Sequence, residues 1–87
     1  MKHRNIPISM VCTTDLDGVI TPVKFRILHK DGTKVQYNIE EIKRIEHTRH
    51  CGIKMIFYYS LIVINGKPYD VVFRYVLEST KWELARI

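Results

Sequence analysis

The sequence has few residues that would cross-link a fold and no segment that would span a membrane. Its 87 residues include only two cysteines, Cys12 and Cys51. We expect both to be free thiols in a reducing compartment. There is no run of about 18 apolar residues, which excludes a membrane-spanning helix. The basic start of the chain is interrupted by Pro7 and has too short an apolar run for a signal peptide. A cytoplasmic protein is therefore expected.

Glycine and proline are also scarce, with four and three residues respectively, and they stand at isolated positions typical of turns. No stretch is repetitive or of low complexity, and no segment has the composition of a linker. With 46% apolar and 26% charged residues, the composition is that of a globular chain. These totals predict one small domain over residues 1–87 with a small core, and the alternating segments described below make it a β domain.

The chain is basic, with 14 lysines and arginines against nine aspartates and glutamates and a net charge of +5. The excess is spread over both halves, since residues 1–50 hold nine basic against six acidic residues. A positive balance of this kind favours acidic partners, including nucleic acid, through non-specific attraction. The alternative is that the charge serves solubility alone.

Apolar and polar residues alternate on both sides of "KDG" at residues 30–32, which predicts a β-hairpin. A three-residue loop over 30–32 pairs apolar with apolar residues, for example Phe25 with Tyr37. It also places Gly32 where the accompanying bulge requires a positive φ. A two-residue loop would instead pair apolar with polar residues, so we predict the longer one.

The segment "KMIFYYSLIVINGKPYDVVFRYV" predicts a second hairpin, for which two turns are possible. A three-residue loop over residues 64–66 pairs Tyr59 with Val71, and this is the register we predict. The alternative is a two-residue turn at Asn65 and Gly66, a dipeptide that strongly favours such turns. In the predicted register, four apolar residues fall on the outer face: Ile56, Tyr58, Ile62 and Val72.

Residues 39–46 fit either a helix or a strand. Ile39, Ile42 and Ile45 recur every three residues, as in a helix, but a helix here would have only about two turns. We expect one helical turn near residues 40–42, followed by a strand over 43–49. The whole pattern predicts an all-β fold with at most one short helical turn: a small antiparallel barrel or strongly bent sheet, SH3-like, with six or seven strands.

Several segments resemble a small bacterial family of unknown function whose members are sometimes encoded near lesion-bypass DNA polymerases. The resemblance covers about three quarters of the chain. The matching segments are "PVKF" (22–25), "DG" (31–32), "YNIEEI" (37–42), "GIKMIFYYSLIV" (52–63), "YDV" (69–71) and "WELAR" (82–86). They are mostly apolar and aromatic and include no catalytic signature. The resemblance therefore implies a small β-barrel and carries over no functional residues.

His47, His50 and Cys51 lie within five residues and are the only metal-ligand candidates that cluster in the sequence. A structural zinc site needs four ligands, and His47 and His50 would point to opposite faces of a strand. We therefore predict no metal site and no cofactor here. The chain also shows no glycine-rich phosphate loop and no nucleophile with a positioned base, so we expect a binding domain that is not an enzyme.

Two binding hypotheses follow from the predicted strands. Basic residues interleaved with an exposed aromatic residue suit single-stranded nucleic acid, because phosphates are attracted and bases can stack. The candidates for this contact, either with nucleic acid or with a protein that processes it, are Lys24, Arg26, Lys34, Tyr58 and Arg74. The alternative is a protein-interaction or homodimerisation module that uses the apolar outer face of the second hairpin. Its candidates are Ile56, Tyr58, Ile62 and Val72.

Overall fold

The computed structural model describes residues 3–87, with side chains from residue 5 onward. All regular structure in this range is β-strand, which confirms the predicted all-β class. No helix in the described part of the chain is long and apolar enough to cross a membrane. The strands are β1 (His3–Thr14), β2 (Ile20–Leu28), β3 (Lys34–His50), β4 (Ile53–Ile64), β5 (Lys67–Val76) and β6 (Lys81–Arg86).

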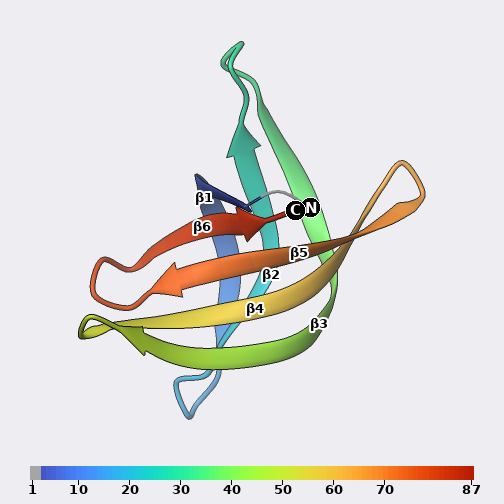
Figure 1. Ribbon diagram of the computed structural model, residues 1–87. Helices are drawn as coiled ribbons and strands as arrows, with labels where there is room; N and C mark the ends of the chain where they lie inside the picture. Colours follow the sequence, from blue (N-terminus) through green and yellow to red (C-terminus); the bar gives the residue numbers. More distant parts are fainter. Residues whose placement is uncertain (1–2) are drawn as a thin grey trace.

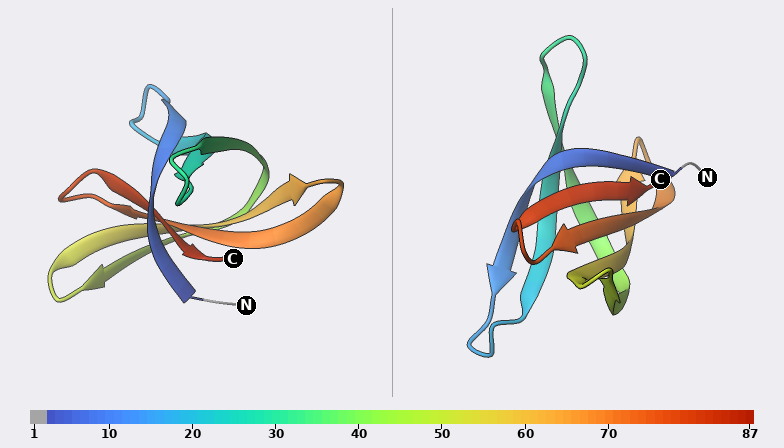
Figure 2. Two further views of the ribbon diagram at one scale, coloured as in Figure 1. Left: turned by 90° about the horizontal axis from the view of Figure 1, so that it is seen from above. Right: turned by 60° about the vertical axis from the view of Figure 1, so that its left-hand side comes forward.

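The six strands form a closed antiparallel barrel in which each strand pairs with the next and β6 pairs with β1. The predicted small antiparallel barrel is therefore confirmed. Figure 1 shows the β2–β3 hairpin rising above the body of the barrel, while β4, β5 and β6 run across it. The two views in Figure 2 show the steep angle at which β1 and β2 cross the sheet formed by the later strands.

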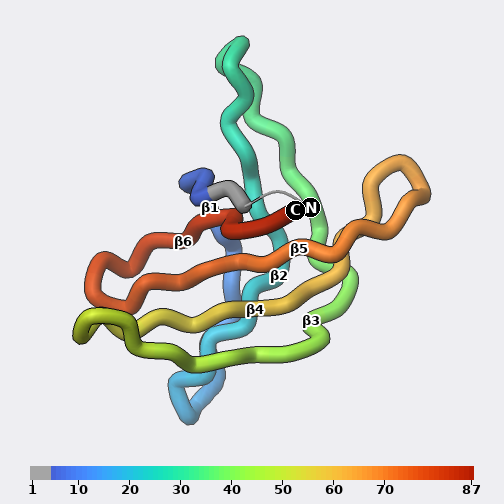
Figure 3. The backbone as a smooth tube through the Cα atoms, viewed as in Figure 1, coloured from blue at the N-terminus to red at the C-terminus, as the bar shows by residue number. Residues whose placement is uncertain are grey.

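Strand β3 closes the barrel because it belongs to both parts of the sheet. Its residues 34–38 pair with β2, and from Ile39 onward it pairs with β4. Two β-bulges, which place Glu40 and Lys43 as extra residues against β4, lie at this change of partner. Bulges bend a strand and increase its twist. Figure 3 shows the resulting bend, where the chain turns from the upright hairpin into the lower sheet.

The helical turn predicted near residues 40–42 is wrong, because this segment is strand throughout. Ile39, Ile42 and Ile45 lie opposite Ile62, Ser60 and Tyr58 of β4, all of which are buried inside the barrel. Directly paired residues share a face, so the three isoleucines all face inward. Each bulge adds one residue to the strand period of two, and this produces a spacing of three without a helix.

Aromatic side chains connect opposite sides of the barrel interior. Phe25 of β2 meets Phe73 of β5 edge to face, with ring centroids 4.8 Å apart, and Tyr37 stacks on Phe25 at 5.4 Å. Since β2 and β5 are three strands apart around the barrel, they make this contact only across its interior. The buried cluster consists of Phe25, Ile56, Tyr58, Ile62, Val71, Phe73, Trp82 and Leu84.

The first predicted hairpin is confirmed and the second is shifted by one residue. In the first, Phe25 pairs with Tyr37 and Gly32 has a φ of 89°. In the second, Asn65 and Gly66 form a two-residue turn with φ values of 52° and 76°. Positive φ at both positions matches the right-handed twist of the strands, so the local turn preference decides the register. A shift of one residue exchanges the two faces of a strand.

Thr80 offers a test of the backbone in the turn between β5 and β6. It has a φ of 56°, which a β-branched residue adopts only with strain. We expect Thr80→Gly to raise the free energy of unfolding by about 0.5–1 kcal/mol, as the relief of strain exceeds the entropic cost of glycine. Urea denaturation measures this. Ser79→Gly in the same turn, where no strain is relieved, should lower stability, and equal effects of the two changes would contradict the interpretation.

Candidate nucleic-acid interface

Three of the predicted nucleic-acid contacts lie together on the outside of the β2–β3 hairpin. Lys24 and Arg26 are two residues apart on β2, and Lys34 pairs with Leu28 at the end of the same hairpin. Phe25 between them points into the core, so the alternate residues point outward. The Arg26 Nε donates a 3.1 Å hydrogen bond to Oε1 of Gln36 across the hairpin. We call the outer side chains of Lys24, Arg26 and Lys34 the basic face.

The basic face is bordered by a hollow and carries no acidic residue on its strands. β1, β2 and residues 34–38 of β3 contain no aspartate or glutamate. A hollow of about 200 Å³ lies where β1 leaves β2 to pair with β6. Pro7, Ile8, Ser9, Arg26, Leu28 and Lys34 line it. Two cations therefore border a concave surface in which no carboxylate on these strands competes for them.

Asp31 lies in the turn at the tip of the hairpin and is engaged locally. Its Oδ1 accepts hydrogen bonds from the Thr33 backbone N–H at 2.9 Å and from the Thr33 hydroxyl at 2.6 Å. The hydroxyl and then the backbone N–H of Thr33 lower the pKa of this carboxyl below its ordinary value. Asp31 thus serves the turn, which is a common role of aspartate at such positions.

Arg74 does not join the basic face. It lies on β5, three strands around the barrel from β2, so its side chain leaves the barrel on another side. Its Nε donates a 2.7 Å hydrogen bond to Glu83 Oε1, and a second guanidinium nitrogen pairs with the same carboxylate. Of the candidate contacts, Arg74 therefore does not share a patch with Lys24 and Arg26, and its charge is balanced by Glu83.

Tyr58 lies inside the barrel and is only 2% exposed, so its predicted place on the outer face is wrong. Its hydroxyl donates a 2.9 Å hydrogen bond to the backbone carbonyl of Ile20, which joins β4 to β2. Burial raises the pKa of the phenol, and the neighbouring Cys12 and Tyr75 add smaller contributions in the same direction. A base cannot stack on this ring without opening the core.

The proposed apolar outer face of the second hairpin is also absent. Ile56 and Ile62 are buried in the core together with Tyr58, because the two-residue turn places these residues on the inner face. Val72 does lie outward, opposite Tyr59, but it is only 6% exposed. Covered in this way, the four interface candidates present no apolar patch to a partner.

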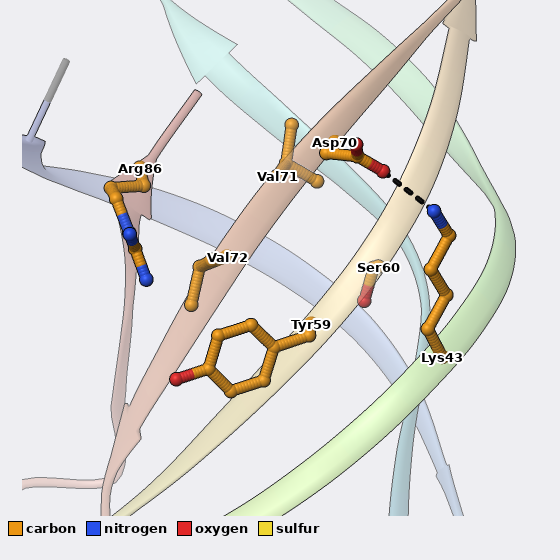
Figure 4. A pocket seen from close by; sticks show the side chains of 7 residues that line it. All are labelled: Lys43, Tyr59, Ser60, Asp70, Val71, Val72 and Arg86. Atoms are coloured by element: carbon orange, nitrogen blue, oxygen red, sulfur yellow. Dashed lines mark hydrogen bonds and ion pairs between the residues drawn. The ribbon is translucent and has the colours of Figure 1, made fainter. Parts of the chain in front are cut away.

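The outer face of β3–β6 carries aromatic and basic residues that the predicted register missed. Tyr59 lies beneath the guanidinium of Arg44, whose central carbon is 4.0 Å from the ring centroid. An adjacent hollow has a volume of about 330 Å³, and Lys43 and Asp70, which help to line it, form a 2.7 Å ion pair (Figure 4). The hydrogen bond and charge of Asp70 raise the pKa of Lys43. Acids and bases alternate on this face, so it gives no uniform positive field.

The two-residue turn signal at Asn65 and Gly66 could have identified this second face from the sequence. Applied to the same strand, it puts Phe57, Tyr59 and Leu61 outward and the residues between them inward. The alternation of apolar and polar residues could not decide between the two registers, because the outward-facing and the inward-facing residues of β4 are both mostly hydrophobic. Turn chemistry therefore carried the information that decides which side chains are accessible.

His47, His50 and Cys51 belong to the hairpin that joins β3 to β4. Cys51 and Gly52 form its two-residue turn, with φ values of 50° and 81°, and His50 pairs with Ile53. His47 pairs with Ile56 on the inner face. In residues 3–87, no group of three or more histidine, cysteine, aspartate or glutamate side chains is arranged to hold a metal ion.

The predicted site is thus reduced to Lys24, Arg26 and Lys34. Comparison of the chain with models of protein families, with curated proteins and with solved structures finds no match. The function of the basic face is therefore inferred from its own chemistry.

Substitution of adjacent tyrosines tests which face of β4 lies in the core. We expect Tyr58→Ala to lower the free energy of unfolding by about 3–5 kcal/mol, because a large buried ring and its hydrogen bond are lost. Tyr59→Ala should cost about 1 kcal/mol, mainly the contact with Arg44. Chemical denaturation of both variants measures the difference. A larger loss for Tyr59→Ala would place the opposite face of β4 in the core.

Burial of the Tyr58 phenol also predicts a dependence of stability on pH. An unfolded tyrosine ionises near its ordinary pKa of 10.0, whereas the pKa of Tyr58 in the folded protein is higher. Between these two values the unfolded state loses its proton first, so the free energy of unfolding falls as pH rises above 10. Tyr58→Phe should show a smaller fall over this interval. The matched control is Tyr59→Phe, and identical pH profiles for both variants would contradict the prediction.

Proposed function

We propose that this protein is a binding domain whose basic face contacts the phosphate backbone of single-stranded nucleic acid. The observation that carries the proposal is the set of three cations on one hairpin, beside a hollow, on strands that contain no acidic residue. Positively charged grooves of this kind attract a nucleic-acid backbone by Coulomb forces.

The spacing of the cations supports contact with a linear polyanion. Lys24 and Arg26 are separated by two residues of an extended strand, or about 7 Å along the chain. Lys34 lies on the neighbouring strand beside Leu28, two residues beyond Arg26. The three charges therefore continue in one direction along the hairpin. A flexible single strand can adjust its backbone to such a row more easily than a rigid duplex.

The basic face offers charge without an aromatic platform. The aromatic residues of this hairpin, Phe25 and Tyr37, point into the barrel and pack against each other. Base stacking, which the sequence hypothesis assigned to Tyr58, is therefore not part of the proposal. We expect binding that is weak, insensitive to base sequence and strongly dependent on salt.

The sequence resemblance to a family sometimes encoded near lesion-bypass DNA polymerases agrees with a nucleic-acid partner, because DNA is the substrate of those polymerases. The competing hypothesis of an apolar protein interface on the second hairpin depended on an exposed apolar face, and this face is absent. Its residues Ile56, Tyr58 and Ile62 are occupied in the core.

A salt-dependent titration with a fluorescent single-stranded oligonucleotide tests the proposal. Three phosphate contacts predict a slope of about −2 in a plot of the logarithm of the binding constant against the logarithm of salt concentration. The triple variant Lys24→Gln, Arg26→Gln and Lys34→Gln should lose binding and most of this slope. No binding of the unaltered protein at about 50 mM salt would contradict the proposal.

A matched variant separates the basic face from net charge. Lys54, Lys67 and Lys81 are exposed residues of β4, β5 and β6, and changing all three to glutamine removes the same total charge. This variant should retain a slope near that of the unaltered protein. An equal loss of binding in both triple variants would show that total charge, and not the basic face, attracts the nucleic acid.

A further inference from the structure

An apolar recess of about 270 Å³ lies at one end of the barrel. Its residues come from the β1–β2 turn, the start of β4 and the ends of β3 and β5, which meet at the same end of an antiparallel barrel. Beside it, residues 43–50 of β3 pair with β4 alone, because pairing with β2 stops at Asn38. The walls are contributed by Asp17, Gly18, Val19, Ile20, Ile45, His47, Ile56, Tyr58, Tyr75 and Leu77.

A second hollow of about 280 Å³ adjoins the apolar recess and is basic. His47 and Leu77 line both of them, so the two spaces are neighbours. Asp17 is the only acidic residue in either set of walls, and it belongs to the apolar recess alone. The basic hollow is lined by His47, Thr48, Arg49, Lys54, Met55 and Leu77.

Arg49 and Lys54 bring two positive charges together in the basic hollow. They lie directly opposite each other on β3 and β4. The Lys54 carbonyl accepts a 3.1 Å hydrogen bond from the Leu77 N–H on its other side, so Arg49 and Lys54 form a non-hydrogen-bonded pair. Side chains are closest in pairs of this kind, and like charges placed so are destabilising. An anion bound between them removes this repulsion.

No carboxylate of the protein neutralises this pair. Among the side chains that the structure describes, the ion pairs join Lys43 to Asp70 and Arg74 to Glu83. Neither Arg49 nor Lys54 takes part in one, and both side chains are exposed. Their charge is therefore available to a ligand.

Strand alternation places these cations on the same face as the apolar walls. His47 pairs with Ile56, and directly paired residues share a face. Arg49 is two residues beyond His47, and Lys54 is two residues before Ile56, so both point to that same side. Leu77, which bonds to Lys54 on the third strand, completes the row. One surface is thus apolar at one end and positively charged at the other.

We propose that this surface binds a small amphipathic anion of the fatty-carboxylate class. The carboxylate lies between Arg49 and Lys54, where charge-assisted hydrogen bonds hold it. The aliphatic tail lies in the apolar recess, between Ile45 and the β1–β2 turn. The hydroxyl of Tyr58 is already bonded to the Ile20 carbonyl, so it does not require a polar group on the tail. The residues of the basic face line neither space, and the proposal does not depend on them.

The dimensions suit a ligand with both a head and a tail. Sites for small ligands usually enclose about 300–1,000 Å³, and the mouths of β-barrels are among their common places. At about 270 and 280 Å³, neither space reaches this range alone, but the two together do. Ile45 and Arg49 are four residues apart on an extended strand, or about 13 Å. A simple anion would leave most of this length empty.

Titration of isotope-labelled protein with octanoate, below its micelle-forming concentration, tests the proposal. The amide NMR signals of residues 45–49, 54–56 and 77 and of the β1–β2 turn should shift together. Each methylene added between butanoate and octanoate should tighten binding about fourfold. Acetate, octanol and octylammonium should each bind at least about tenfold more weakly than octanoate. Equal affinity for acetate would overturn the proposal by showing a site for anions only, and equal affinity for octanol by showing an apolar site only.

Paired variants locate the head and the tail. The double change Arg49→Gln and Lys54→Gln should weaken octanoate binding at least about tenfold. Lys67→Gln with Lys81→Gln removes the same charge from exposed residues that line neither space, and it should leave the affinity unchanged. An equal loss in both double variants would contradict a specific site, because net charge alone would then attract the ligand.

For the tail, Leu77→Asp should also abolish most of the binding, since Leu77 is 40% exposed and borders both spaces. Its control is Val63→Asp, a change at another exposed apolar residue that lines neither space. Unchanged octanoate affinity in Leu77→Asp would exclude the tail from the recess and overturn the proposal.

Discussion

The bend of β3 at its two bulges is the constraint on which the rest of this barrel depends. A straight strand of this length could run along β2 or along β4, but it could not follow both, because these two strands cross at a steep angle. The extra residues Glu40 and Lys43 rotate and bend the strand, so that its first part completes one side of the barrel and its second part begins the other. The interior that results is filled by aromatic and aliphatic side chains, and the contact between Phe25 and Phe73 connects the two sides.

The same bend distributes the surfaces that can bind partners. It leaves the β2–β3 hairpin as a projecting ribbon with Lys24, Arg26 and Lys34 on its outer side. It also carries the end of β3 away from β2, which opens an apolar recess and frees one edge of the sheet. The mixed face around Tyr59, where acids and bases are paired, lies on the outside of the later strands. Three chemically distinct surfaces therefore arise from one backbone distortion and the strand order.

Sequence alone was sufficient where alternation and turn chemistry agreed. In the first hairpin, the three-residue loop and the polar partners of Arg26 gave the correct register, and with it the basic face. In the second hairpin both faces are apolar, so alternation could not distinguish Tyr58 from Tyr59, and the predicted register exchanged them. The bulges were hidden for a different reason. Their positions depend on the pairing of β3 with both β2 and β4, which the local sequence does not reveal. They also place inward-facing isoleucines three residues apart, which is the spacing expected of a helix.

The most direct test is the measurement of cross-strand nuclear Overhauser effects between β3 and β4 in solution. Two bulges predict contacts that step by one residue at each of them: Ile39 with Ile62, Ile42 with Ser60, and Ile45 with Tyr58. A strand without bulges would instead continue the first register and place Glu41 opposite Ser60 and Lys43 opposite Tyr58. Observation of that continuous register, or of helical contacts between residues three apart, would contradict the bent strand on which the barrel and its surfaces depend.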